Sequence, residues 1–363
     1  MSYRTGFFLN RAIDGAFEQW DRERDGLFEE LTSPEVSTTF AFSRCVPSWN
    51  ASLPDGSWLE IMLRVRSGSV WTSWRSMGVW APDESIVKRH SSAEHDDDVA
   101  RVETDTLVVA SLADAFQARF RFRLGVDSAH GAAPPGIQGI HAFALAYTDA
   151  KPVVTSGSGE GTLSACGLAG HVVPGVPRCS QMIYPDGGTV WCSPTSVAMV
   201  LGHWLGDTEE CEHRVRAAVG GVYDHAYEGY GNWSFNVAYA GSIPGIEAYV
   251  ACFAGLDRLE PWIQAGVPVI LSVSWDNDHG KILGGAPIPR SNGHLTTLVG
   301  FDDAGDAVMN EPASPSNEAV RRVYDRHELE ARWLAASGGA AYLIYPSASG
   351  TDDRAALFAR TIG

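Results

Sequence analysis

The stretch that decides the fold is WCSPTSVAMVL, residues 191–201. Pro194 suits the first turn of a helix, where its missing N–H leaves no hydrogen bond unmade. The apolar residues that follow recur at the spacing of one helical face: Val197, Val200, Leu201 and Trp204. The sequence therefore predicts a helix that begins at or just after Cys192 and turns one apolar face to a core.

Cys192 stands at the N-terminus of this predicted helix. The positive end of a helix dipole lowers the pKa of a thiol and favours the thiolate, which is the nucleophilic form. Free cysteines are also among the most buried residue types, so a small core residue is the alternative interpretation. The remainder of the sequence favours the interpretation of Cys192 as a nucleophile.

An antiparallel sheet is predicted beyond the helix. Residues 295–301 and 307–310 form two strands joined by a tight turn. A hairpin places the start of one strand beside the end of the next, so His294 is expected to lie near Asn310 and Glu311. One helix followed by an antiparallel sheet is an α+β arrangement.

These residues are the parts of a Cys–His catalytic site. Cys192 is the expected nucleophile and His294 the base, and Glu311 or Asn310 holds the imidazole. Gln181 is a candidate donor to an oxyanion, beside the backbone N–H of Cys192. The candidates for substrate binding lie next to these residues or in an aromatic, glycine-rich loop: Trp191, Tyr230, Asn232, Trp233, Asn236 and Gly293. For the members between 230 and 236, capping of the core beneath the loop is the alternative.

The N-terminal part of the chain has a β pattern from about residue 36 to 148. Short alternating strands with turn residues between them predict an all-β sandwich. Five tryptophans lie in this part: Trp49, Trp58, Trp71, Trp74 and Trp80. Packing in the core or on the sheet face is the favoured interpretation, and a carbohydrate platform is the alternative. The acidic run at 90–98 is interpreted as a solvated loop rather than a calcium site.

Composition excludes several classes of partner and site. A net charge of −17 argues against nucleic acid and anionic membranes, and no apolar run is long enough to predict a membrane-spanning helix. The six cysteines form no C-x-x-C pair, so we expect reduced thiols, with Cys166–Cys179 as the alternative disulfide. We expect no metal and no cofactor. The first residues lack a signal-peptide core, which indicates a cytoplasmic protein, or a secreted one if a leader precedes this sequence.

Three motifs, in this order, resemble the peptidase C39-like family, the papain-fold group that includes bacteriocin-processing double-glycine peptidases. They are SQM at 180–182 followed by WCSPTS at 191–196, then SNGH at 291–294, and NEP at 310–312. The resemblance implies a papain-like α+β domain and assigns the nucleophile to Cys192, the base to His294 and the oxyanion donor to Gln181. The family usually has Asp before the proline, where this chain has Glu311. Papain-like enzymes can use Asn instead, so Asn310 remains the rival.

The N-terminal motifs resemble the β-sandwich that precedes such domains in bacterial family members. They are residues 46–51, 71–74 and 78–81. We therefore predict four regions: a β-sandwich accessory domain at 1–150, a linker at 151–175, a papain-like cysteine peptidase domain at 176–347 and an exposed C-terminal tail at 348–363. The predicted activity is hydrolysis of a peptide or amide bond through a thioester acyl-enzyme. The alternatives are an acyltransferase or transpeptidase with the same site, and a non-catalytic protein that binds glycan or cell wall.

Overall fold

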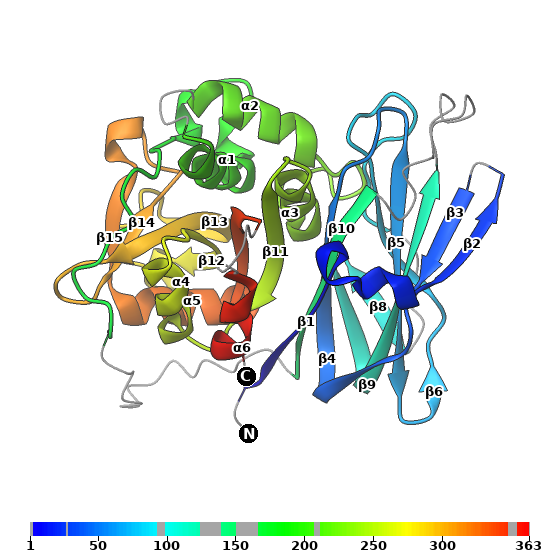
Figure 1. Cartoon of the computed structure of the whole chain (residues 1–363). Coiled ribbons are helices and arrows are strands. Elements are labelled where there is room, and N and C mark those ends of the chain that lie inside the picture. Colours follow the sequence, from blue (N-terminus) through cyan, green and yellow to red (C-terminus); the bar gives the residue numbers. More distant parts are fainter. Residues whose placement is uncertain are drawn as a thin grey trace. The chain divides into compact units, whose positions relative to one another are not determined.

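The chain folds into two compact units, each described separately (Figure 1). The computed structural model describes residues 3–26, 28–92, 99–123, 139–149, 166–206, 211–347 and 354–362. The N-terminal unit comprises Gly6–Ala150 and Gly221–Val250. The C-terminal unit comprises Met1–Thr5, Lys151–Gly220 and Ala251–Gly363. The predicted linker up to residue 165 and most of the acidic run at 90–98 lie outside the described residues.

The N-terminal unit is built on a ten-stranded sheet. Its hydrogen-bonded path is β1-β10-β4-β9-β3-β2, while β5 pairs with β6, β7 and β9, and β8 pairs with β9. The strands are β1 (Thr5–Arg11), β2 (Asp21–Asp25), β3 (Phe28–Thr32), β4 (Val36–Ala51), β5 (Trp58–Ser67), β6 (Val70–Trp71), β7 (Arg75–Trp80), β8 (Ala100–Glu103), β9 (Thr106–Arg123) and β10 (Ile140–Thr148). The long strand β9 pairs with β4 and β8 near its start and with β5 and β3 near its end. Because this strand is shared, hydrogen bonds join all ten strands, and the arrangement as a two-sheet sandwich stays a prediction.

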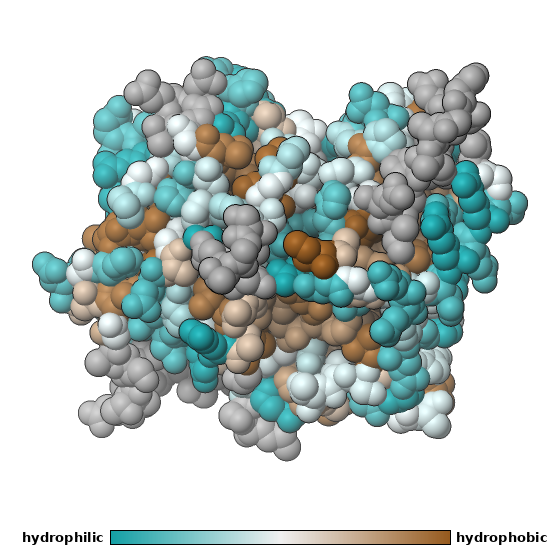
Figure 2. Space-filling view, viewed as in Figure 1, coloured by the Kyte–Doolittle hydropathy of each residue, from teal (hydrophilic) through white to brown (hydrophobic). Residues whose placement is uncertain are grey.

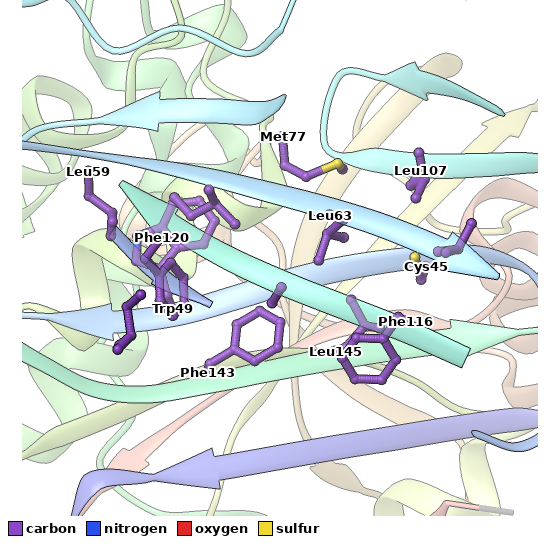
Figure 3. Packing of buried hydrophobic residues seen from close by; sticks show 14 of the residues in the cluster. Cys45, Trp49, Leu59, Leu63, Met77, Leu107, Phe116, Phe120, Phe143 and Leu145 are labelled. Carbon is purple, nitrogen blue, oxygen red and sulfur yellow. The ribbon is translucent and has the colours of Figure 1, made fainter. Parts of the chain in front are cut away.

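Strict alternation of side chains creates the core of this unit (Figure 3). On β5, Leu59, Ile61 and Leu63 are fully buried, and the residues between them reach the other face. Phe120 of β9 lies directly opposite Ile61 and is also buried. Since successive side chains of a strand point to opposite faces, this pattern buries one face and leaves the other partly open to solvent. Trp49 and Trp80 also belong to the core, whereas Trp58, Trp71 and Trp74 are half-buried.

The segment 221–250 belongs to the N-terminal unit, although we predicted it to be part of the second domain. Its helix α3 (Trp233–Gly241) places Phe235 against Trp49, with ring centroids 6.3 Å apart. Asn50 of β4 bonds both backbone groups of Ala248, over 2.8 Å from the N–H and 2.7 Å to the carbonyl. Sequence order alone did not reveal this, because the pairing joins residues about two hundred positions apart.

The C-terminal unit combines helices with a second sheet. This sheet has the strand order β11-β16-β12-β13-β14-β15. The strands are β11 (Ile246–Cys252), β12 (Val269–Asp276), β13 (Arg290–Phe301), β14 (Ala307–Asn310), β15 (Arg321–Tyr324) and β16 (Ala340–Pro346). The main helices are α1 (Cys192–Leu205), α2 (Cys211–Val222), α4 (Glu260–Gln264), α5 (Arg326–Ser337) and α6 (Phe358–Thr361). The prediction of one helix followed by an antiparallel sheet is confirmed for α1, β12, β13 and β14.

The apolar face predicted for α1 is buried, and so are the other side chains of the helix from Ser193 to Gly202. One expectation about this unit is wrong. The C-terminal tail was predicted to be exposed, yet Phe358 and Thr361 are buried. Trp262 of α4 contacts the Phe358 ring at 4.9 Å and donates its indole N–H to Thr361 Oγ1 over 3.1 Å. Within the described residues, no helix is long and apolar enough to cross a membrane.

Candidate active site

Cys192 is the first residue of α1, as the position of Pro194 predicted. Cys192 as a whole residue is only partly buried, while the next residues of the helix are enclosed. Ser196, one turn along α1, donates its hydroxyl to the carbonyl of Leu295 over 3.1 Å. This bond ties the first turns of α1 to β13, the strand that carries the candidate base His294.

His294 lies on β13, opposite Val273 of β12, and is 3% exposed. Its ring stands perpendicular to the ring of Trp275, with centroids 5.2 Å apart. Trp275 is itself buried and donates its indole N–H to the Ile288 carbonyl over 2.9 Å. An aromatic ring held in place in this way restricts the imidazole and keeps water from one side of it.

Glu311 directly follows β14 and is fully buried. His294 Nε2 lies 2.5 Å from Glu311 Oε1, and the backbone N–H of Ala313 donates to the same oxygen over 2.9 Å. The Tyr324 hydroxyl donates to Oε2 over 3.1 Å. Each carboxylate oxygen therefore has a partner, as a buried charge requires.

Asn310 points away from His294. Its amide N–H donates to the Pro177 carbonyl over 2.8 Å, and its oxygen accepts from Arg321 Nε over 2.8 Å. Neighbouring residues at a strand end face opposite sides, so only one of Asn310 and Glu311 reaches the imidazole. In this structure that residue is Glu311.

The electrostatics of the three groups are coupled. Burial alone lowers the pKa of His294, but the Glu311 carboxylate and the hydrogen bond with Cys192 raise it to about 10. Burial works the other way on the thiol, yet the hydrogen bond and charge of His294 hold the pKa of Cys192 below its ordinary value. Burial likewise opposes the ionisation of Glu311, and His294 overcomes it to lower the pKa of that carboxyl. The arrangement favours a thiolate beside an imidazolium.

Gln181 begins a short 3-10 turn, Gln181–Ile183, and is 2% exposed. Its backbone N–H donates to the Pro312 carbonyl over 2.8 Å, so it lies beside the residues that follow Glu311. Its side-chain oxygen is buried and has no hydrogen-bond partner within the described ranges. Gly188 lies in the connection between Gln181 and Cys192 and packs against the backbone of Gln181. A larger residue does not fit there, because its Cβ would stand 1.9 Å from the Gln181 carbonyl oxygen.

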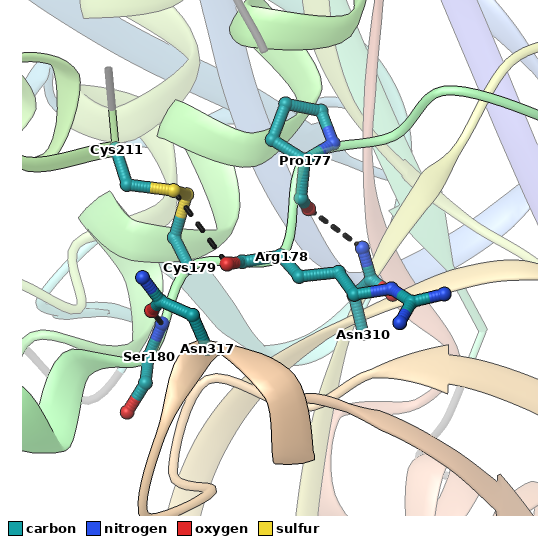
Figure 4. The surroundings of a disulfide bond; sticks show 7 residues. All are labelled: Pro177, Arg178, Cys179, Ser180, Cys211, Asn310 and Asn317. Atoms are coloured by element: carbon teal, nitrogen blue, oxygen red, sulfur yellow. Dashed lines mark hydrogen bonds between the residues drawn. A yellow bond between two sulfur atoms is a disulfide. The ribbon is translucent and has the colours of Figure 1, made fainter. Parts of the chain in front are cut away.

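A disulfide joins Cys179 to Cys211, with Cα atoms 5.6 Å apart (Figure 4). The expectation of reduced thiols, and the alternative Cys166–Cys179 pair, are therefore wrong. The Cys211 sulfur also lies 3.6 Å from the Arg178 carbonyl oxygen. Next along the chain, the backbone N–H of Ser180 donates to the Asn317 side chain over 2.7 Å. The disulfide thus anchors the short segment that carries Gln181.

The predicted substrate-binding residues are divided between the units. Trp191 is buried, and its ring centroid lies 5.6 Å from that of Tyr184. Trp191 therefore supports the backbone directly before the nucleophile. Gly293 is exposed, with open space where a Cβ would stand. Four others lie in the N-terminal unit and make local contacts there: Tyr230, Asn232, Trp233 and Asn236.

The contacts of these four residues are those of a capped helix. Asn232 caps α3 through the Phe235 N–H at 3.0 Å. The Asn236 amide donates to the carbonyls of Asn232 and Tyr230, each over 2.8 Å. Trp233 donates its backbone N–H to Asp105 over 2.5 Å. Core capping accounts for these contacts, and the role in substrate binding stays a prediction.

Two residues of the site were not identified from the sequence. Trp275 is the next-to-last residue of the apolar strand β12 and pairs with Ser291, three residues before His294. The strand register, which the sequence does not give, would have revealed its position beside His294. Tyr324 ends β15, and nothing local distinguishes it from a core tyrosine. Across the described ranges, no group of three His, Cys, Asp or Glu is arranged to hold a metal ion.

Two family models match the two parts of the chain. Residues 20–144 match the model of the peptidase C39 N-terminal domain, and residues 173–341 match that of the Peptidase C39 like family. A solved structure assigned as a C39-like peptidase from Bacillus anthracis is similar, with 18% identity and a TM-score of 0.36. The match covers 49% of this chain and 98% of that chain. No curated protein matches. Residues 173–341 thus belong to the Peptidase C39 like family, and residues 20–144 to the peptidase C39 N-terminal domains.

Proposed function

We propose that the chain is a cysteine peptidase of papain-like fold that hydrolyses a peptide or amide bond. The observation that carries this proposal is the continuous contact from Cys192 through His294 to Glu311, with 2.5 Å between His294 Nε2 and Glu311 Oε1. A thiolate and an imidazolium, held by a buried carboxylate, are the groups that such catalysis needs.

In the proposed reaction, the Cys192 thiolate attacks the substrate carbonyl carbon and the carbonyl oxygen becomes an oxyanion. The Cys192 backbone N–H, at the start of α1, and the Gln181 amide are the proposed donors to that oxyanion. The imidazolium of His294 gives its proton to the leaving amine as the C–N bond breaks, which leaves a thioester. A water molecule then loses a proton to His294 and attacks the thioester, which releases the acid and restores the thiolate.

The rate at which iodoacetamide alkylates Cys192, measured against pH, tests whether His294 activates the thiol. We expect an apparent thiol pKa well below the free value of about 8.5, and a rise towards that value in His294→Ala. Cys166 is the matched control, since it is a partly exposed free cysteine whose pKa burial raises. An ordinary thiol pKa at Cys192 that is indifferent to His294 contradicts the proposal.

Digestion of peptides tests whether the activated thiol supports hydrolysis. A peptide library digested by the full chain should yield cleaved products, and Cys192→Ala should abolish them while leaving the folded state intact. Cys166→Ala should cleave as the wild type does. Products joined to an added amine, in place of hydrolysed ones, would instead indicate acyl transfer from the same thioester.

A further inference from the structure

A hollow of about 610 Å³ lies on the sheet of the N-terminal unit, distant in sequence from the candidate catalytic residues. This volume is within the range of about 300–1,000 Å³ that is typical of small-molecule sites. Its walls come from β2, β3, β5 and β9, and include Phe28, Trp58 and Arg121. Figure 2 shows hydrophilic colours over the side where Figure 1 places β2, all of whose residues are exposed.

Strand register explains why these side chains share one face. Phe28 of β3 and Trp58 of β5 both lie opposite Arg123, which stands between them on β9. Two residues further along each strand, Glu30 and Glu60 both lie opposite Arg121. Directly paired residues of an antiparallel sheet point to the same side, so the rings and charges form two adjacent rows.

The two aromatic rings supply an apolar surface that the core does not use. The centroids of Phe28 and Trp58 are 6.0 Å apart with the planes at 64°. Phe28 is 41% exposed although it is a large apolar residue. The buried face of the same strands is filled by other residues, such as Leu31 and Phe122. The rings are therefore available to a ligand.

Charged groups of both signs surround the rings. Arg121 is held by Glu30, with 2.6 Å from Nε to Oε1, and by Glu60, with 3.5 Å from a terminal nitrogen to Oε2. On the edge strand β2, Glu23 lies directly opposite Glu30, a like-charge pair that disfavours folding. In the described part of the chain, the side-chain carboxylates of Glu23 and Asp25 have no hydrogen-bond or ion-pair partner, so their oxygens are free to accept hydrogen bonds.

We propose that this hollow binds a neutral saccharide. The C–H face of a sugar ring packs on aromatic rings, and its hydroxyls both donate and accept, which suits carboxylates and guanidinium groups in one site. A cation would meet Arg121, and an anion would meet Glu23, Asp25 and Glu30. The site does not depend on the proposed peptidase reaction.

Calorimetric titration of the full chain tests this with four neutral probes: cellohexaose, maltohexaose, xylohexaose and the hexamer of N-acetylglucosamine. At least one should bind, and Trp58→Ala should weaken that binding tenfold or more. Glu23→Gln changes an exposed side chain and leaves folding intact, and it should weaken binding several-fold. Cys192→Ala should bind as the wild type does, which separates this site from the peptidase chemistry.

Trp71→Ala is the matched control. Trp71 is half-buried on the same sheet, but it packs against Arg64 and Arg66, with 5.0 and 5.8 Å from their guanidinium carbons to its ring. This variant should keep the wild-type affinity. The proposal is overturned if none of the four probes binds at millimolar concentration, or if Trp58→Ala and Glu23→Gln bind as tightly as the wild type. Equal weakening by Trp71→Ala overturns it as well.

Discussion

The hydroxyl of Tyr324 donates a hydrogen bond to Oε2 of Glu311 across 3.1 Å. The other oxygen of Glu311 lies 2.5 Å from His294 and also accepts the Ala313 N–H. Glutamate has one more rotatable bond than aspartate, and fixing such a bond costs conformational entropy. Anchoring at both oxygens offsets the greater freedom of the longer side chain.

Tyr324→Phe should therefore lower kcat/KM for a cleaved peptide by roughly 3- to 30-fold, equivalent to about 0.7–2 kcal/mol. The loss should fall mainly on kcat, because Tyr324 acts through Glu311 and not on the substrate. The measurement is the pH profile of kcat/KM. Tyr345→Phe, at another buried tyrosine of this unit, is the matched control. An unchanged profile in Tyr324→Phe would show that the bond has no role in positioning.

Glu311→Gln keeps the size of the side chain but removes its charge. Without the carboxylate, the pKa of His294 should fall from about 10 towards its ordinary value of about 6.5. The thiolate–imidazolium pair then weakens, and we expect kcat/KM to fall by about 10²- to 10⁴-fold, as for loss of the carboxylate in comparable triads. Steady-state kinetics with the alkylation profile of Cys192 measures both effects.

Asn310→Ala separates the two candidates for the third position. It removes the bonds to Pro177 and Arg321, so it should destabilise the fold by roughly 1–3 kcal/mol. The alkylation profile of Cys192 should stay that of the wild type. A loss of thiolate character in Asn310→Ala, with Glu311→Gln unaffected, would reverse the assignment.

Stability should depend on pH in two windows. The pKa of His294 is raised to about 10 in the folded state, so protonation of His294 stabilises the fold. This contribution is complete at pH values below the pKa in the unfolded chain, about 6.5. That contribution is lost as pH rises from there through about 10. The lowered pKa of Glu311 stabilises the fold above about 4.5, and the contribution is lost as pH falls through the folded value. Urea unfolding from pH 4 to about 10.5 should show both slopes, and the double variant His294→Gln/Glu311→Gln should flatten them.

Reduction of the Cys179–Cys211 disulfide should lower the free energy of unfolding by about 2–4 kcal/mol, since it closes a loop with a sequence separation of 32. The measurement is the urea midpoint with and without reductant. The double variant Cys179→Ser/Cys211→Ser should match the reduced protein, and Cys166→Ser should match the oxidised wild type. Identical midpoints in all four would contradict a stabilising disulfide.

The sequence by itself determined the local elements of the site. Pro194 and the apolar spacing after it fix the start of α1 at Cys192, because a proline without an N–H fits only the first helical turn. The apolar run before His294 and the tight turn after Phe301 determine β12, β13 and β14, since a hairpin follows from residues close in the chain. The alternating pattern of β5 was readable for the same reason.

Only the tertiary structure decided which side chains meet. Whether Asn310 or Glu311 faces His294 depends on register, and a shift of one residue reverses the face. The pairing of Cys179 with Cys211 and of Asn50 with Ala248 joins residues far apart in the chain, and their distances depend on how the elements pack. Local propensity carries no information about such contacts, because they form only when distant elements bury their apolar faces against one another.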